Sequence, residues 1–454
     1  MPWPAWVAVF EEAVRLDPQN RTYRLHLAIA HLGSQDAEAR QAARSVIEEQ
    51  VEVPALKAAA LRALVLDALK EAQTERALRL AEELDASPEH LFTDRLLYLR
   101  VLHGVNSPDF HTRLAETEKA AAQSPEWILP LMTWMNSDHL AILARDWAQQ
   151  LPRESTASIP IRIEIARSYA AYGDWKQLQF FLADEKWGDS DYLKQAYLAR
   201  CYRERERADG MAKTTWSEAV NLAGNNGESL MKLALTARQW GWQTETEQTL
   251  WVAAMKSNKA IEALNGLCEF YFSKHDAAGL LRVYTLLLEH DPNDKVTLNN
   301  FASFCLLMDQ DTARAFGIAR DLYEKEPKNP VYASTYAFAL FRTGKNLQAV
   351  EVMEKLKPED LRTPSVAAYY SAFLDAAGRA DQAREYRQWA HGVSLFPEEE
   401  KMLNFTVVQP SPEAAAESAV TATPAPTATP APTATPAPTA TPEPTATPEP
   451  TATP

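Results

Sequence analysis

Apolar residues along the chain recur with the spacing of helices that bury one face. In one run the positions i, i+3, i+4 and i+7 are Leu264, Leu267, Cys268 and Tyr271. A second run contains Leu280, Tyr284 and Leu287, and it is closed by Pro292. Because the first spacing is that of one helix face and proline ends a helix, the pattern predicts two consecutive helices joined by a short turn.

The two-helix pattern repeats with a period of about 34 residues. Gly344 and Ala349 recur as Gly378 and Ala383, and the same shift relates Tyr336 to Tyr370 and Leu340 to Leu374. Gly173 and Gly241 take the same place in earlier units, where we expect the first helix to end in a left-handed residue. Small residues let the two helices of a pair approach closely, and we expect that role for Ala166, Ala234, Ser303 and Ala337. Tyr169, Tyr271 and Tyr284 are expected to fill the gap between them.

These residues resemble the tetratricopeptide repeat (TPR) family, whose pattern is W-x2-L-G-x2-Y, then A-x3-F, then P. "LNGLCEFYF" at 264–272 follows the first part, with Leu264 in place of the Trp and Cys268 in place of the Gly. "LDPQN" (16–20), "HDPND" (290–294) and "EPKNP" (326–330) are similar to the family's turn between repeats. The resemblance implies an all-α fold, a right-handed α-solenoid of stacked helix-turn-helix repeats. The composition after residue 409 adds a disordered C-terminal tail to this fold.

The match to the repeat pattern varies along the chain and defines five segments. Residues 1–20 read as a partial repeat with a second helix only, 21–158 as degenerate helical repeats, and 159–395 as seven TPR-like repeats in good register. Within the degenerate part, Pro130 and Pro152 suggest that 126–155 is shortened. Residues 396–409 are expected to cap the last pair, with Phe396 and Phe405 as packing residues, and 410–454 form the tail.

The two ends of the sequence differ from the repeats. The first helix would expose an apolar flank, comprising Trp3, Trp6, Val7, Phe10 and Val14. We therefore expect the natural chain to begin upstream of Met1; docking of this helix on a partner or on a second copy is the alternative. The tail repeats TATPAP and TATPEP, a composition typical of extended, disordered spacers, and it is open to O-glycosylation outside the cytoplasm.

Composition and charge exclude several classes of function. The net charge is −15, and glycine is scarce at 14 of 454 residues. Nucleic-acid binding, including RNA binding by a helical repeat of similar period, needs a cationic surface that this balance does not supply. The sequence lacks phosphate loops, paired metal-binding histidines and nucleophile motifs. Its three cysteines are too far apart in the sequence for a zinc motif. We therefore expect no enzyme activity, no catalytic residue, no cofactor and no metal.

The resemblance implies that the first helices of the pairs line a concave groove that binds a peptide or a helix. The expected groove residues are Arg167, Arg200, Arg203, Arg238, Asn265, Glu269, Asn300, Phe304, Phe338 and Phe341. The change from arginines to aromatics suggests a partner with an acidic part and an apolar part. Nine of the twelve tryptophans lie between 127 and 251, where packing between helices is the favoured interpretation over groove anchors.

The sequence thus favours a protein–protein interaction scaffold without catalysis, whose protein or peptide partner it does not identify. The alternative is a regulatory or assembly portion of a larger enzyme or cell-envelope machine that is truncated at its N-terminus. No run is long and apolar enough to span a membrane, and no signal peptide is visible. The cytoplasm is the default location, with the cell envelope or periplasm left open if a signal lies upstream.

Overall fold

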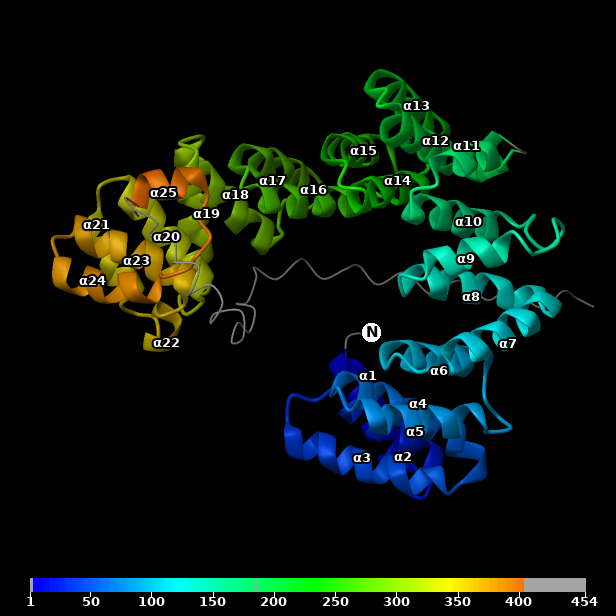
Figure 1. Ribbon diagram of the computed structural model, residues 1–454. Helices are drawn as coiled ribbons and strands as arrows, with labels where there is room; N and C mark the ends of the chain where they lie inside the picture. The colour runs from blue at the N-terminus through cyan, green and yellow to red at the C-terminus, as the bar shows by residue number, and fades with distance from the viewer. Residues whose placement is uncertain (1–2, 184–185, 404–454) are drawn as a thin grey trace, which may run out of the picture. The chain divides into compact units, whose positions relative to one another are not determined.

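A computed structural model describes residues 3–183 and 186–403, and in this part of the chain all regular structure is helical (Figure 1). The tail at 410–454 and Phe405 lie outside the described residues. The chain divides into two compact units, which comprise residues 3–219 and 220–403 of the described part. The boundary falls inside helix α13. We describe each unit by itself.

The first unit contains a leading helix and then helices that follow one another in pairs. Each helix from α1 to α11 packs against the next one along the chain. The elements are α1 (Trp3–Leu16), α2 (Arg21–His31), α3 (Ala37–Val51), α4 (Pro54–Lys70), α5 (Thr74–Asp85), α6 (Phe92–Gly104), α7 (Phe110–Gln123), α8 (Pro125–Ser137), α9 (Ala141–Ala148), α10 (Ile159–Tyr172), α11 (Trp175–Ala183), the 3-10 turn η1 (Gly188–Ser190), α12 (Asp191–Glu206) and α13 (Asp209–Ala223).

The second unit continues with helix pairs and ends in a short helix that belongs to no pair. First helices also contact the first helix of the next pair, as α18 does with α20 and α20 with α23. The elements are α14 (Gly227–Gln239), α15 (Gln243–Lys256), α16 (Ala260–Lys274), α17 (Ala277–His290), α18 (Lys295–Leu307), α19 (Thr312–Lys325), α20 (Pro330–Arg342), α21 (Asn346–Met353), α22 (Pro358–Leu361), α23 (Pro364–Ala376), α24 (Ala380–Trp389) and α25 (Pro397–Leu403).

The turn inside each pair recurs with the predicted period, to within one position, from α4 to α24. At each turn the residue at the recurring position has a positive φ: Ala72, Asn106, His139, Gly173, Arg207, Gly241, His275, Asp309, Gly344 and Gly378. The next residue donates its backbone N–H back to a carbonyl in the last turn of the first helix, as Asp174 does to Tyr169 at 3.0 Å and Trp242 to Ala237 at 2.9 Å. This is the Schellman arrangement, which satisfies carbonyls that the helix leaves unpaired. The predicted left-handed glycines are thus confirmed, and six turns achieve the same geometry without glycine.

The stretch 126–155 forms a pair in the same register as its neighbours, and the expected shortening is seen in its second helix, α9, which has only eight residues. Helices α8 and α9 are joined at His139, which follows Asn106 and precedes Gly173 by one period of the repeat, to within one position. Pro130 lies inside α8 without ending it. Asn136 ties the pair to the next, because its side chain donates to the Glu164 carbonyl at 3.0 Å and accepts from Ser168 at 2.9 Å.

The helices of a pair meet through small residues and aromatic rings, as the sequence indicates. Ala166, Ala234 and Ala337 are buried, but the place expected for Ser303 belongs to its fully buried neighbour Ala302. The turn that follows is longer by one residue, with both Asp309 and Asp311 at positive φ. The assignments for α18 are therefore shifted by one position.

Helix α1 packs on α2 through aromatic rings. Phe10 stacks on His26 with ring centroids 5.2 Å apart, and Trp6 lies next to Phe10. Trp6 and Leu16 remain exposed. Among the central tryptophans, Trp147, Trp187, Trp216 and Trp242 are buried between helices, and Trp251 donates its indole N–H to Tyr271 at 2.9 Å. For these tryptophans the packing interpretation is correct.

Candidate functional site

The arginines predicted for the groove in the first unit have partners within that unit. On α10, Arg167 lies 3.6 Å from Glu164. On α12, the Arg200 guanidinium lies over the Trp175 ring at 5.1 Å, and burial lowers its pKa, while Arg203 lies 3.8 Å from Asp209. An arginine stacked on an aromatic ring contributes packing as well as charge.

Two of the predicted residues of the second unit join successive first helices, and the other polar ones are half-buried or bond elsewhere. Arg238 of α14 pairs with Glu269 of α16 at 2.9 Å, and both side chains are exposed. Asn265 is half-buried on α16, and Asn300 of α18 donates to the Tyr284 hydroxyl at 3.3 Å. The Arg238–Glu269 pair thus joins two adjacent first helices, although an exposed pair contributes little to stability.

The predicted aromatic residues are mostly buried and do not form an open surface. Phe338 is 1% exposed and packs against Tyr369, and Phe341 lies 5.2 Å from Phe373. Phe304 is 7% exposed and stacks on the Tyr284 ring. This corrects the expectation that Phe304 and Phe338 face an open groove, because neighbouring side chains cover both.

One residue that covers Phe304 comes from the end of the described chain. Phe396 is 8% exposed, and its ring lies 5.3 Å from Phe304, 5.8 Å from Phe272 and 5.5 Å from His275. Just before it, the Ser394 hydroxyl lies 2.6 Å from His275 Nε2. Residues 393–403, which we call the C-terminal segment, therefore contact the end of α16, α18 and α23; α25, within this segment, is orange in Figure 1.

A partly buried polar contact holds the segment three residues further on. The Tyr369 hydroxyl of α23 donates to the Glu399 carboxylate, which also accepts the backbone N–H of Phe396 at 2.9 Å. Burial raises the pKa of Glu399, and burial beside this carboxylate raises the pKa of Tyr369 well above its ordinary value. The segment thus contacts four residues of the repeats: Phe272, His275, Phe304 and Tyr369.

Sequence reasoning identified Phe396 as a packing residue but not what it packs against. It also missed His275, Tyr369 and Glu399. A signal for His275 was present, because it lies one period of the repeat after Gly241, in the left-handed place. No sequence signal joins Glu399 to Tyr369, since their contact depends on the path of the chain after α24.

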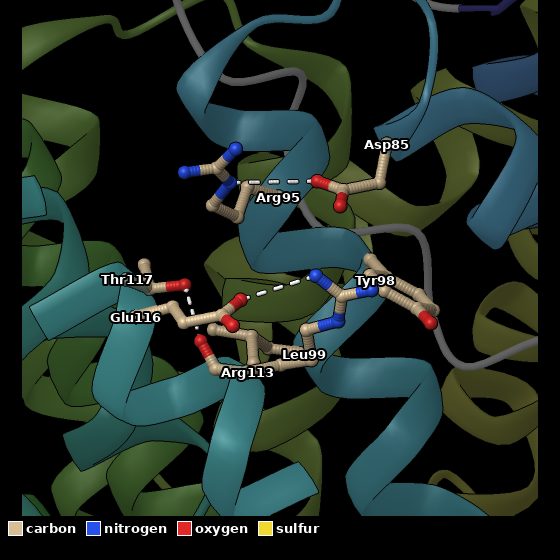
Figure 2. A pocket seen from close by; sticks show the side chains of 7 residues that line it. All are labelled: Asp85, Arg95, Tyr98, Leu99, Arg113, Glu116 and Thr117. Atoms are coloured by element: carbon tan, nitrogen blue, oxygen red, sulfur yellow. Dashed lines mark hydrogen bonds and ion pairs between the residues drawn. The ribbon is translucent and has the colours of Figure 1, made fainter. Parts of the chain in front are cut away.

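Two hollows in the first unit differ in size and enclosure. Figure 2 shows a pocket of about 20 Å³, enough for one water, beside the Arg113–Glu116 pair at 3.1 Å and the Arg95–Asp85 pair at 3.4 Å. A larger, open hollow of about 650 Å³ lies between α8 and the start of α10, and Glu126 and Glu154 are among the residues that line it. The Arg113–Glu116 and Arg95–Asp85 pairs at the smaller pocket are ordinary ion pairs between side chains on helix surfaces.

The three cysteines have the properties of core residues. Cys201 and Cys305 are buried, and Cys268 is half-buried. Burial raises the pKa of Cys268 to about 12 and that of Cys305 to about 11. Because the thiolate is the reactive form, these two thiols are poor nucleophiles at neutral pH.

Two further properties concern metal ions and membranes. Residues 3–183 and 186–403 contain no group of three or more His, Cys, Asp and Glu side chains arranged to hold a metal ion. Over the same residues, every helix is too short or too polar to cross a membrane.

Comparison with known proteins adds little to this geometry. No family model and no curated protein matches the chain. Among solved structures, this chain matches a protein chain of the structure of Naa15/Naa10 bound to HypK-THB, with 12% sequence identity and a TM-score of 0.28. That match covers 88% of this chain and 68% of the other. A TM-score this low does not indicate a shared fold, so the fold assignment rests on the chain's own geometry: an all-α protein built of repeated helix pairs.

Proposed function

We propose that the chain is a non-enzymatic scaffold of the TPR type, which binds a protein partner through a peptide or helix laid along the first helices of the second unit. The recurrence of the turn from Ala72 to Gly378 carries this proposal. Repeats of one geometry stack their first helices side by side and so build an extended surface, which is how solenoid proteins bind partners.

The exposed side chains on these first helices favour partner binding. Leu235 is 55% exposed on α14, and Phe272 is 39% exposed on α16, close to the Arg238–Glu269 pair. Aromatic and arginine side chains provide most of the binding energy in protein interfaces when a partner buries them. The two exposed apolar groups beside a charged pair suit a partner segment with both apolar and charged residues.

Introducing charge on this surface tests the proposal. The full chain with Leu235→Glu and Phe272→Glu is compared with wild type in affinity purification followed by quantitative mass spectrometry. The matched control, Met255→Glu with Leu347→Glu, alters two exposed apolar residues on second helices, α15 and α21. We expect the chain with Leu235→Glu and Phe272→Glu to lose its specific partners while the control keeps them. Equal retention by both variants would contradict the proposal.

A further inference from the structure

The C-terminal segment makes the contacts of a bound peptide rather than those of another repeat. After α24 ends at Trp389, the chain turns at Gly392, which has φ +77°, and leaves the register of the pairs. Val393 and Leu395 then join an apolar cluster on α23 that includes Ala368 and Ala372. Helix α25, of seven residues, contacts α23 but forms no helix pair of the repeat kind within the described residues.

Phe396 is the apolar anchor of the segment. It contacts residues that lie far earlier in the sequence: Phe272, His275 and Phe304. These residues come from two consecutive repeats, because Phe272 lies at the end of α16, His275 directly follows that helix, and Phe304 belongs to α18. A single aromatic side chain therefore lies between two first helices, as an anchor residue does in a peptide-binding groove.

Glu399 is the polar anchor, three residues after the aromatic one. Its carboxylate accepts hydrogen bonds from the Tyr369 hydroxyl and from the backbone N–H of Phe396. Among residues 393–402, Leu395 and Phe396 are buried and four more are half-buried, whereas Glu400 and Lys401 are exposed. A contact set this small can be exchanged for an equivalent one without unfolding the repeats beneath it.

We propose that the C-terminal segment is an intramolecular ligand that covers a binding site for an external peptide of the same chemistry: an aromatic residue followed three residues later by a carboxylate. This inference rests on the proposed scaffold function and specifies the partner of one surface. The aromatic residue of the external peptide takes the place of Phe396 on Phe272 and Phe304, and its carboxylate takes the place of Glu399 at Tyr369.

The covalent connection makes the chain's own segment a strong competitor. A short flexible tether gives an effective concentration of about 1 mM, so a segment with an intrinsic Kd of about 10 μM would keep its site about 99% covered. An external peptide of equal intrinsic affinity would then bind about 100-fold more weakly to the wild-type chain than to a chain whose segment is released.

The test uses the full chain and a fluorescent peptide with the sequence of residues 392–403, with binding measured by anisotropy. Two variants, Phe396→Ala and Glu399→Ala, each remove a different contact of the segment and are expected to release it. Glu400→Ala changes an exposed neighbouring residue and is the control. We expect both release variants to bind the peptide at least 10-fold more tightly than wild type and the control to bind as wild type does. Circular dichroism verifies that each variant keeps its helix content.

A second peptide, with alanine in place of its phenylalanine, must bind the release variants at least 10-fold more weakly than the first. Equal binding of the two peptides, or equal affinity of all four chains for the first peptide, would overturn the inference. A wild-type dimer in sedimentation that Phe396→Ala abolishes would also overturn it, because the segment would then occupy a second copy. If peptide binding fails while Leu235→Glu with Phe272→Glu still loses its partners, the inference is wrong and the scaffold function stands.

Discussion

Gly279 provides a stringent test of how the helices of one pair meet. It lies in the first turn of α17, where an added Cβ would stand 2.6 Å from Cγ and 2.7 Å from Cε1 of Tyr271. Tyr271 is 2% exposed, and its hydroxyl is held by Trp251 at 2.9 Å and by Arg282 at 3.0 Å. The ring therefore cannot move aside without losing these hydrogen bonds, and Gly279→Ala forces α16 and α17 apart.

The magnitude follows from two opposing effects. Overpacking a buried site costs roughly 1–3 kcal/mol, and alanine regains up to about 1 kcal/mol over glycine within a helix. We expect Gly279→Ala to lower the free energy of unfolding of this region by about 1–2 kcal/mol. Gly317 in α19 is the matched control, because a Cβ there meets no atom within 4 Å. Gly317→Ala should gain about 0.5–1 kcal/mol.

Hydrogen exchange resolved by peptide is the appropriate assay, supported by urea unfolding followed by circular dichroism. A repeat array does not have to unfold in one step, so a local measurement is needed. We expect faster exchange in α16 and α17 of Gly279→Ala and slower exchange in α19 of Gly317→Ala. If the two substitutions stabilise their helices equally, the described contact between Gly279 and Tyr271 is wrong.

Three further predictions concern the first unit. Ala72→Gly should raise the free energy of unfolding by about 0.5–1 kcal/mol in urea titrations, because Ala72 holds φ +55° at an exposed turn; a loss of stability would refute the left-handed assignment. Arg62→Ala leaves the 1%-exposed Asp94 carboxylate without its guanidinium partner, and it should lower the free energy of unfolding by about 3–5 kcal/mol in the same titrations. The exposed Arg113→Ala should lower it by less than about 1 kcal/mol, and equal losses of stability would contradict the role of burial. Burial raises the pKa of Glu118 from 4.5 to about 7, so the stability it contributes is complete below pH 4.5 and is lost as pH rises through 7. Glu118→Gln should therefore melt at a higher temperature than wild type at pH 8 and at about the same temperature at pH 5; equal melting temperatures at both values would contradict this.

The repeat is readable from the sequence wherever a residue type has a strong backbone preference. Gly173, Gly241, Gly344 and Gly378 mark their turns because glycine adopts a positive φ without steric cost. The other six turns carry side chains at this position, and the period of the repeat connects them. Asn106, His139, His275 and Asp309 are of types that tolerate a positive φ better than most, but Ala72 and Arg207 carry no such signal.

Packing between repeats is less predictable than the repeats themselves. The one-residue extension at Asp309 to Asp311 shifts the helix before it out of register, so Ser303 replaced Ala302 in the expected core. The cover on Phe304 was not predictable, because Phe396 reaches it from a distant part of the sequence. Periodicity reports which face of a helix is buried, but not which distant segment buries it.

Photochemical cross-linking from position 272 tests the central claim most directly, because Phe272 is partly exposed and its ring lies 5.8 Å from that of Phe396. The full chain with Phe272→benzoylphenylalanine is irradiated with and without the peptide of residues 392–403, and so is the same chain with Phe396→Ala. When Phe396 is present, we predict a cross-link to the chain's own 393–403 segment, with or without added peptide. In the Phe396→Ala chain with added peptide, we predict a cross-link to the peptide. A cross-link to the peptide of equal yield in both chains, or to neither segment nor peptide, would contradict the assignment of this surface as a peptide-binding site covered by the chain itself.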